Sequence, residues 1–448
     1  MVQTTHIGIA IILFMVSSPL AAQSVRTDTV ALSLAEAVAR ARRMNPDLRA
    51  ERAEARAAAQ GPLAASRAFL PSLQLDVRGV RTTDPVAVFG TKLRQENFAA
   101  ADLGLDPLNR PAPYPGYTSS ATVTVPVLAP EGLYGYTAAR RAAAASAAAA
   151  RRAAGATEFQ VTRAYWDAQL AARRVEALSE ALAAARAHVR AAEALNREGL
   201  VTGLDARLAR VRAAEVETRL VGARAAAANA RAGLAAMLAL PDSQSLVLTD
   251  SLSIDRDPEV AAATGDAPET RADLAALALG VEAASAALRS AWASNLPSLA
   301  LFGALAYHGR SSPWSNGSGD WTIGIGLTWK PFQALSGVGA VRRARARRDA
   351  AEARREAAER QAAVEVANAR RMVTAAGERV TVAGAAYDEA LAALEQARRR
   401  YRTGTSPITE LLDVQAAATS AHLSLLSARR DLFVARAALD FAMGAYDR

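Results

Sequence analysis

The chain has 448 residues and carries 53 Lys and Arg against 44 Asp and Glu, a formal charge of +9. Hydrophobic residues make up 51% and aromatic residues only 5%; much of the apolar fraction is alanine, which forms helices well but fills a thick core poorly, so long slender helices are expected. The absence of cysteine excludes disulfides, thiolate metal sites, cysteine nucleophiles and a lipid anchor through cysteine.

The N-terminus has the pattern of a secretory signal peptide. Residues 7–16 are an unbroken apolar run, and small residues follow it up to Ala22. The run is too short for a membrane anchor, so we expect residues 1–22 to be a cleaved signal peptide. No later segment reaches 18 consecutive apolar residues, which predicts an exported chain without a transmembrane helix.

The rest of the chain is duplicated. The sequence Leu-Pro-Ser-Leu at 70–73 returns at 296–299, an offset of 226 residues, and from Pro126 and Pro331 onward the offset is 205. The difference of 21 residues predicts one longer loop in the first half, within 84–116. We therefore expect a first repeat over 23–240, a linker or equatorial segment over 241–268 and a second repeat over 269–448.

Each repeat contains two segments of alternating apolar and polar residues, at about 70–82 and 117–127, and at about 298–308 and 320–330. Their length suits tilted membrane strands. Trp321 and Trp329 lie eight residues apart, roughly 26 Å along a strand, which matches the two aromatic girdles of a membrane barrel. Tyr117 and Tyr307 are further candidates for the membrane interface. A pair of half-buried hairpins on a soluble core is the alternative.

Two long helical hairpins are predicted, at 132–240 and 337–444. Larger apolar residues recur every seven positions among alanines, which is typical of a coiled-coil seam; in the second repeat they are Val366, Val373, Val380, Tyr387, Leu394 and Tyr401, followed by Leu411, Ala418, Leu425, Leu432 and Leu439. Gly199 and Gly404 lie just past a helix end in each repeat. Ser406 suits an N-cap with Pro407 at the first helical position.

The predicted fold is mainly α with membrane β: antiparallel coiled-coil hairpins plus four transmembrane strands per protomer. Four strands cannot close a barrel, and an open sheet edge is not tolerated in lipid. The chain is therefore expected to oligomerise in order to close its sheet.

With these features, the sequence resembles the TolC family of outer-membrane efflux proteins. The resemblance rests on the duplicated plan, the Leu-Pro-Ser-Leu strand entries, the strand exits at Pro126 and Pro331, the Gly-Leu-Val-Thr-Gly-Leu-Asp turn at 199–205 and the segment 85–93. It implies a homotrimer whose 12-stranded barrel lies in the outer membrane and continues as a helical tunnel, an α-barrel, across the periplasm. It further implies a periplasmic adaptor and an inner-membrane pump as partners in a tripartite efflux system.

The same resemblance assigns site residues at the helical tips. By motif position Glu410 and Asp413 match an acidic ring at the constriction, while Asp205 and Tyr401 match a hydrogen-bond network that closes the gate. The arginine expected two residues after Gly404 is Ser406 here, so the gate is expected to be latched differently. The tips that adaptors grip correspond to Gly199, Leu200, Gly203, Gly404 and Thr405.

Threefold symmetry would bring six carboxylates from Glu410 and Asp413 together, which predicts attraction of cations at the tip. The plainer interpretation is that both acids lie in a first helical turn, where the helix dipole favours them.

Two other functional classes fit parts of the sequence. The clustered arginines suit a basic coiled coil that binds nucleic acid, but the signal peptide and the interspersed glutamates argue against a nucleic-acid partner. A soluble periplasmic adaptor would have one hairpin rather than two. No nucleophile–base pair, metal cluster or phosphate loop stands out, so we expect neither an enzyme nor a cofactor or metal site. The sequence does not identify the exported substrate.

Overall fold

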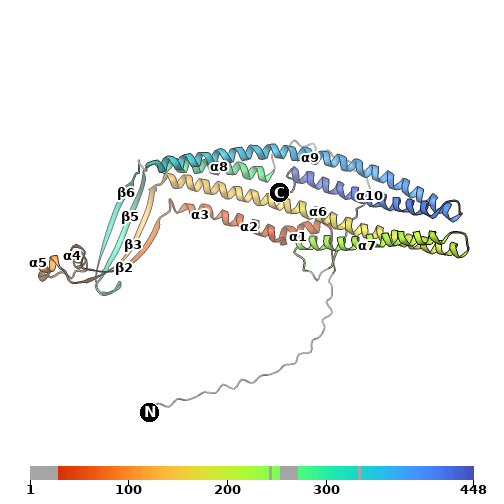
Figure 1. The fold of residues 1–448 in the computed structure, drawn as a ribbon. Helices are drawn as coiled ribbons and strands as arrows, with labels where there is room; N and C mark the ends of the chain where they lie inside the picture. Colours follow the sequence, from red (N-terminus) through yellow and green to blue (C-terminus); the bar gives the residue numbers. More distant parts are fainter. Residues whose placement is uncertain (1–28, 242–244, 253–270, 316, 331–333, 448) are drawn as a thin grey trace, which may run out of the picture.

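The computed structural model describes residues 29–241, 245–252, 271–315, 317–330 and 334–447. A four-stranded sheet lies at one end, and long helices extend from it to two helical turns at the other (Figure 1). The expected signal peptide at 1–22, most of the linker at 241–268 and the strand exit at Pro331 lie outside the described residues.

Two antiparallel helical hairpins form the long part of the molecule. The first consists of α6 (Pro130–Arg197, 68 residues) and α7 (Gly203–Met237, 35 residues). The second consists of α9 (Ala334–Arg402, 69 residues) and α10 (Ile408–Ala442, 35 residues). The long helices reach roughly 100 Å at 1.5 Å per residue. The helices of the two hairpins have nearly identical lengths, as the duplicated sequence predicts.

The seam predicted from seven-residue spacing is buried. On α9, Val366, Val373, Leu394 and Tyr401 are buried, Tyr387 is half-buried, and Val380 packs against the cluster that contains Val366 and Val373. On α10, Leu411, Ala418, Leu425, Leu432 and Leu439 are all buried. Val366 and Val373 of α9 share one buried cluster with Leu432 and Leu439 of α10 and with alanines of both helices. The coiled-coil prediction is therefore confirmed for the second hairpin.

Shorter helices run beside α6 on the way to the sheet (Figure 1). They are α1 (Leu34–Met44), α2 (Pro46–Ala59) and α3 (Gly61–Ser66) in the first half and α8 (Ala272–Ala293) in the second. Of the helices within the described residues, α8 alone is long and apolar enough to cross a membrane by length and composition, which is weak evidence for a span. Counting uninterrupted apolar runs missed it because Asp273, Glu282 and Arg289 interrupt the sequence.

A small parallel sheet that the sequence did not reveal lies halfway along the helices. It pairs β1 (Thr29–Leu32) with β4 (Ser245–Leu248). The buried Tyr165 hydroxyl donates to the Leu32 carbonyl at 3.0 Å and accepts the Asp250 N–H at 3.2 Å. The neighbouring Trp166 ring stacks on Phe433 with ring centroids 4.2 Å apart. These contacts tie the small sheet, α6 and α10 together.

The four-stranded sheet is antiparallel, with the order β2-β3-β5-β6. Its strands are β2 (Ser72–Thr82), β3 (Tyr114–Leu128), β5 (Ser298–Gly309) and β6 (Gly317–Thr328). Register places the odd-numbered residues of all four strands on one face, which is largely apolar, including Leu73, Leu75, Val123, Leu305, Trp321, Ile323, Ile325 and Leu327. The other face carries residues such as Gln74, Thr122, Thr124 and Thr322. Strands β2 and β6 are the edges.

The longer connection of the first half is not a plain loop. Between β2 and β3 it contains α4 (Pro85–Arg94), the short 3-10 helix η1 (Ala100–Leu103) and α5 (Leu105–Asn109). Asp84 caps α4 by accepting the Ala87 N–H at 2.6 Å, with Pro85 at the first helical position.

A buried ion-pair network fixes the C-terminal segment. The Asp447 carboxylate accepts the Ala272 N–H at 2.8 Å and lies 3.4 Å from Arg152. Arg271, also buried, binds Asp273 at 2.7 Å and Glu365 at 2.8 Å. The network therefore connects α6, α8 and α9 to the residues that follow α10.

Candidate functional site at the hairpin tips

Both hairpins end in the same glycine-centred turn. Gly199 and Gly404 have φ angles of +74° and +72°, a conformation that L side chains rarely adopt. The residue after each glycine, Leu200 or Thr405, donates its N–H to a carbonyl five residues earlier, at 2.9 Å and 3.0 Å. These bonds define the Schellman motif that closes a helix end. The tip glycines predicted from the sequence thus serve the same function in both repeats.

The helices that follow the turns start differently from each other. The Asp205 carboxylate accepts both the Thr202 N–H at 3.1 Å and the Thr202 hydroxyl at 3.3 Å, and Gly203 is the first residue of α7. In the second hairpin α10 begins at Ile408 with Pro407 as its N-cap, so the predicted Ser406 cap is wrong. The Ser406 hydroxyl instead donates to Glu410 at 2.6 Å.

Tyr401 lies in an apolar cluster shared by the two tips. The cluster contains Ala192, Ala206, Ala209, Leu394, Ala397, Tyr401, Ile408, Leu411, Leu412 and Ala418. Burial, and to a lesser degree the charge of Asp205, raise the pKa of Tyr401. Its hydroxyl makes no hydrogen bond within the described residues. Within one chain, therefore, Tyr401 and Asp205 do not share a hydrogen bond, and their place in a gate network stays a prediction.

The two acids of the predicted constriction are each paired with an arginine. Glu410 binds Arg400 at 2.7 Å within its own hairpin. Asp413 binds Arg212 at 3.2 Å, and Arg212 lies on α7 of the other hairpin. Arg212 also binds Glu215 at 2.9 Å, and these two carboxylates, Glu215 foremost, raise the pKa of its guanidinium. In a single chain, therefore, both acidic side chains are paired with arginines.

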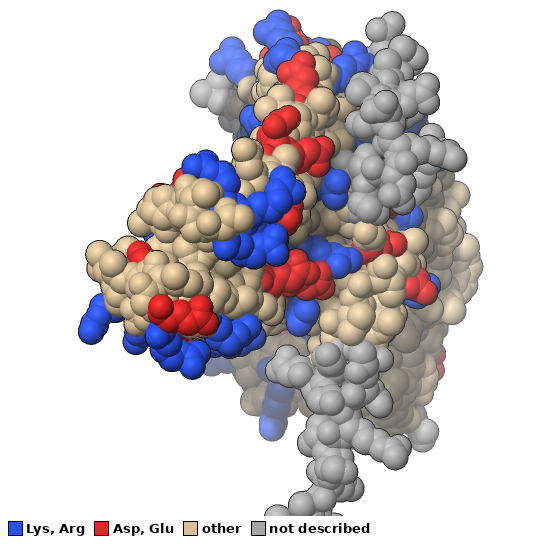
Figure 2. Space-filling model, turned by 90° about the vertical axis from the view of Figure 1, so that its right-hand side faces the viewer, with Lys and Arg blue, Asp and Glu red and all other residues tan. Residues whose placement is uncertain are grey.

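Sequence reasoning missed Arg212 and Arg400. The repeat offset of 205 residues aligns Asp413 with Leu208, and Arg212 lies one helical turn beyond Leu208. Within one turn of Leu208 the sequence has Arg207, Arg210 and Arg212, so Arg212 is one of three candidate cross-hairpin partners that the sequence offers. The end view agrees with this pairing, because acidic and basic side chains are intermixed at the tips (Figure 2).

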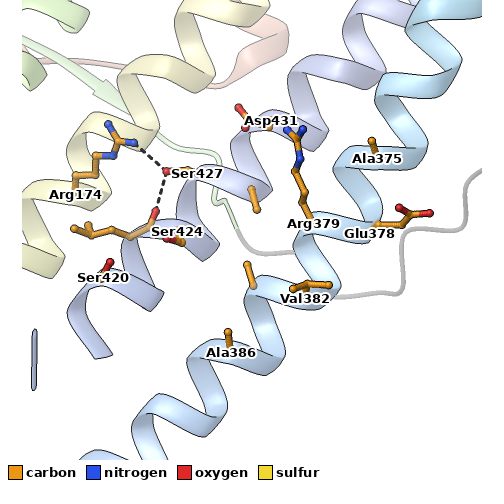
Figure 3. A pocket seen from close by; sticks show the side chains of 13 residues that line it. Arg174, Ala375, Glu378, Arg379, Val382, Ala386, Ser420, Ser424, Ser427 and Asp431 are labelled. Atoms are coloured by element: carbon orange, nitrogen blue, oxygen red, sulfur yellow. Dashed lines mark hydrogen bonds between the residues drawn. The ribbon is translucent and has the colours of Figure 1, made fainter. Parts of the chain in front are cut away.

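A groove lies further from the tips, between α10, α9 and α6 (Figure 3). It encloses about 800 Å³ and is lined largely by alanines and serines of α9 and α10. Arg174 of α6 crosses to Ser427 of α10 with a hydrogen bond of 2.9 Å, and Arg379 points toward Asp431 (Figure 3). The small side chains leave space between α9 and α10, further from the tips than the apolar cluster around Tyr401.

Of the aromatic residues predicted for a membrane interface, Tyr117 and Tyr307 lie near the end of the sheet that is farther from the hairpins, whereas Trp321 lies near the middle of β6. Trp321 is on β6 and is 71% exposed, and Tyr307 on β5 donates its hydroxyl to the Ser315 carbonyl at 2.8 Å. Tyr117 pairs with Gly309 of β5 near the same end. Trp329 follows β6 at the opposite end and donates to the Asn295 carbonyl at 3.2 Å.

Among the described residues, no group of three or more His, Asp and Glu side chains is placed to hold a metal ion.

Solved structures with a similar fold are bacterial outer-membrane channels. The Campylobacter jejuni channel CmeC aligns with a TM-score of 0.77 at 17% identity, over 92% of this chain and 85% of its own. VceC from Vibrio cholerae gives 0.75 at 20% identity, over 92% and 96%. The open state of the Neisseria gonorrhoeae channel MtrE gives 0.71 at 19% identity, over 92% and 88%. These similarities establish a shared fold.

No curated protein matches the sequence. A family model does match, under the description outer membrane efflux protein, over residues 37–240 and 264–445. These two segments correspond to the two repeats and cover most of the chain, including both hairpins, the four-stranded sheet and the tips. The chain therefore belongs to the outer membrane efflux protein family, the TolC family.

Proposed function

We propose that this protein is the exit duct of a tripartite efflux system, a passive channel that carries solutes from an inner-membrane pump and its periplasmic adaptor across the outer membrane. The observation that carries the proposal is the continuity of two structures in one chain. A sheet with one apolar face adjoins helical hairpins roughly 100 Å long. The sheet suits a lipid bilayer, and the hairpins suit a water-filled space beyond it.

The proposed assembly is a homotrimer. Strands β2 and β6 leave two open edges, which lipid does not tolerate, and three copies would close them into a 12-stranded barrel. Helix α8 supports an assembly as well, because only 6% of its most apolar stretch is buried within one chain. A second copy packed against α8 would cover this surface.

The proposed location is the outer membrane, with the hairpins extending into the periplasm. The exposed apolar row on β6, Trp321, Ile323, Ile325 and Leu327, would face lipid. Trp321, Tyr117 and Tyr307, in the halves of their strands farther from the hairpins, and Trp329, at the other end, would mark the interfaces. Without cysteine, the chain has no site for a lipid anchor on that residue.

The hairpin tips would form the gate and the docking end. Glu410 and Asp413 would face the narrow end of the duct, and Arg212 would hold the two hairpins together through Asp413. Tyr401 and Asp205 would support this region through packing and through the capping of α7. The adaptor would contact the exposed turns, formed by Gly199, Leu200, Gly203, Gly404 and Thr405.

Reconstitution tests this proposal directly. The full chain, purified from membranes in detergent, should have the mass of three copies and should produce discrete conductance steps in planar bilayers. Cell fractionation separates the proposal from the soluble adaptor alternative, because a duct sediments with outer membranes. A folded single subunit in the soluble periplasmic fraction, without conductance, would contradict the proposal.

A further inference from the structure

The segment between β2 and β3 folds over one end of the sheet, and residues 85–109 are called the cap from here on. Helices α4 and α5 of the cap lie at the end of the sheet opposite to the helical hairpins (Figure 1). The second repeat has no counterpart, because only residues 310–316 connect β5 to β6. The cap is thus an addition to one half of a duplicated plan.

Buried polar contacts hold the cap in place. Gln95 is fully buried, donates to the Gly309 carbonyl at 2.6 Å and accepts the Tyr114 hydroxyl at 3.0 Å. Arg310 then donates to the carbonyls of Gln95 and Glu96, both at 3.0 Å. Because these bonds join the cap to β3 and to the end of β5, the cap is a fixed part of the fold.

The cap lies against the polar face of the sheet at the end farther from the hairpins. A side chain at Gly116 of β3 would come within 2.9 Å of Thr91 of α4, so the two elements are in close contact there. Register aligns Arg78, Thr118 and His308 in one row on this same face. In the proposed duct the polar face lines the lumen, since the apolar face meets lipid.

A cavity of about 450 Å³ lies between α4 and this row of the sheet. Arg78 and Arg94 both line it, and neither forms an ion pair within the described residues. Its other lining residues include the hydroxyl-bearing Thr82, Thr91 and Thr118, and none is Asp or Glu. The cavity is therefore lined by two arginines, both solvent-exposed, and by several hydroxyl-bearing residues.

Within the described residues, Asp84, Asp320 and Asp76 form no ion pair with these arginines. Asp84 caps α4, and Asp320 binds His308 at 2.9 Å. Asp76 lies on the same face as Arg78, two residues along β2, and forms no ion pair with it. Guanidinium groups bind oxyanions in a forked geometry, and hydroxyls can complete such a site.

We infer that this cavity binds the oxyanion group, whether phosphate, sulfonate or carboxylate, of a departing solute, and that the outer mouth of the duct favours anionic solutes. The inference rests on the proposed function for the lumenal position of the cavity. Binding itself requires only the folded chain. A cation-rich mouth raises the local concentration of anions and holds back cations.

The experiment uses the full chain in detergent and the trisulfonated dye pyranine as the probe, with inorganic pyrophosphate as competitor. Fluorescence anisotropy should rise with saturable binding of one dye per chain and should fall when pyrophosphate or salt is added. Arg78→Gln and Arg94→Gln should each raise Kd about tenfold, on the scale of one charge-assisted hydrogen bond.

Arg81→Gln is the matched control, because Arg81 lies on the same strand as Arg78 but on the opposite face. Its Kd should stay within about twofold of the parent value, which is clearly smaller than the roughly tenfold change expected for Arg78→Gln and Arg94→Gln. Absence of saturable binding, or an equal loss in Arg81→Gln, would overturn the inference. If the protein conducts ions in bilayers but does not bind the dye, the anion site is rejected and the proposed channel function still holds. If it binds the dye but does not conduct, the proposed channel function is rejected instead.

Discussion

Arg212 of α7 and Asp413 of α10 form an ion pair of 3.2 Å that connects the two helical hairpins at their tips. The side chains are 45% and 69% exposed, so water screens the pair in a single chain. Exposed pairs of this kind contribute about 0.2–1 kcal/mol. The pair therefore matters for the position of the hairpins more than for overall stability.

Arg212→Gln is expected to loosen the tips and to raise the mean single-channel conductance of the proposed duct, with a change in the free energy of unfolding below about 1 kcal/mol. Planar bilayer recording and denaturant titration measure the two effects. Arg219→Gln is the control, because Arg219 lies seven residues further along α7 and is exposed without an ion pair in the described residues. Equal conductance of the two variants would reject a latch at Arg212.

Tyr165→Phe should destabilise the chain by about 1–3 kcal/mol, because the Leu32 carbonyl and the Asp250 N–H both lose the phenol hydroxyl as a partner. Thermal or denaturant unfolding checks the value. Tyr387→Phe removes a hydroxyl that makes no hydrogen bond in the described residues and should change stability by less than about 0.5 kcal/mol. Equal losses in both variants would contradict the bridging function of Tyr165.

The same phenol predicts a dependence of stability on alkaline pH. Burial raises the pKa of Tyr165 to about 12, whereas the same phenol in the unfolded chain has a pKa near 10. The folded state therefore holds its proton more tightly, and its stabilisation is complete below pH 10 and is lost as pH rises toward 12. Unfolding measured across this window should show a shallower decline in Tyr165→Phe than in the parent chain.

Asp447→Asn should lower stability by about 3 kcal/mol, because it removes the charge that faces the partly buried Arg152 and weakens the bond to the Ala272 N–H. The Asp447 side chain is only 2% exposed. Asp349→Asn is the comparison, since Asp349 pairs with Arg348 on the exposed surface of α9. Similar melting temperatures for the two variants would show that the C-terminal network is dispensable.

Alanine at Gly199 or Gly404 should strain the tip turns by about 1–2 kcal/mol each, because both positions require positive φ. No neighbouring atom lies within 4 Å of the added carbon, so the effect is conformational alone. Gly222→Ala, within α7 and equally unobstructed, should instead stabilise the helix by about 0.5–1 kcal/mol. Hydrogen exchange at the tips and global unfolding separate these opposite outcomes.

Periodicity predicted most of the fold because large residues stand out in an alanine-rich chain. The seven-residue spacing from Val366 to Tyr401 gave the α9 seam, and the glycines at 199 and 404 gave the turns. Alternation located the four strands of the sheet to within three residues at each end. These features depend on local geometry, which a sequence carries directly.

Features that depend on contacts between residues far apart in the chain could not be predicted from the sequence. Strands β1 and β4 have four residues each, too few to show alternation, and they lie more than 200 residues apart. The Arg212–Asp413 pair joins two helices from different repeats. Ser406 was predicted as a cap from residue type alone, but α10 begins two residues later and the hydroxyl binds Glu410.

The cap occurs in one repeat, whereas the glycine-centred turns at Gly199 and Gly404, which form the corners of the two hairpins, occur in both. A ring of three chains, as proposed, would thus offer six nearly equivalent corners at one end and three caps at the other. A ring-shaped partner at the corners could match the assembly with three or six subunits. A molecule that grips the opposite rim would meet a strictly threefold pattern.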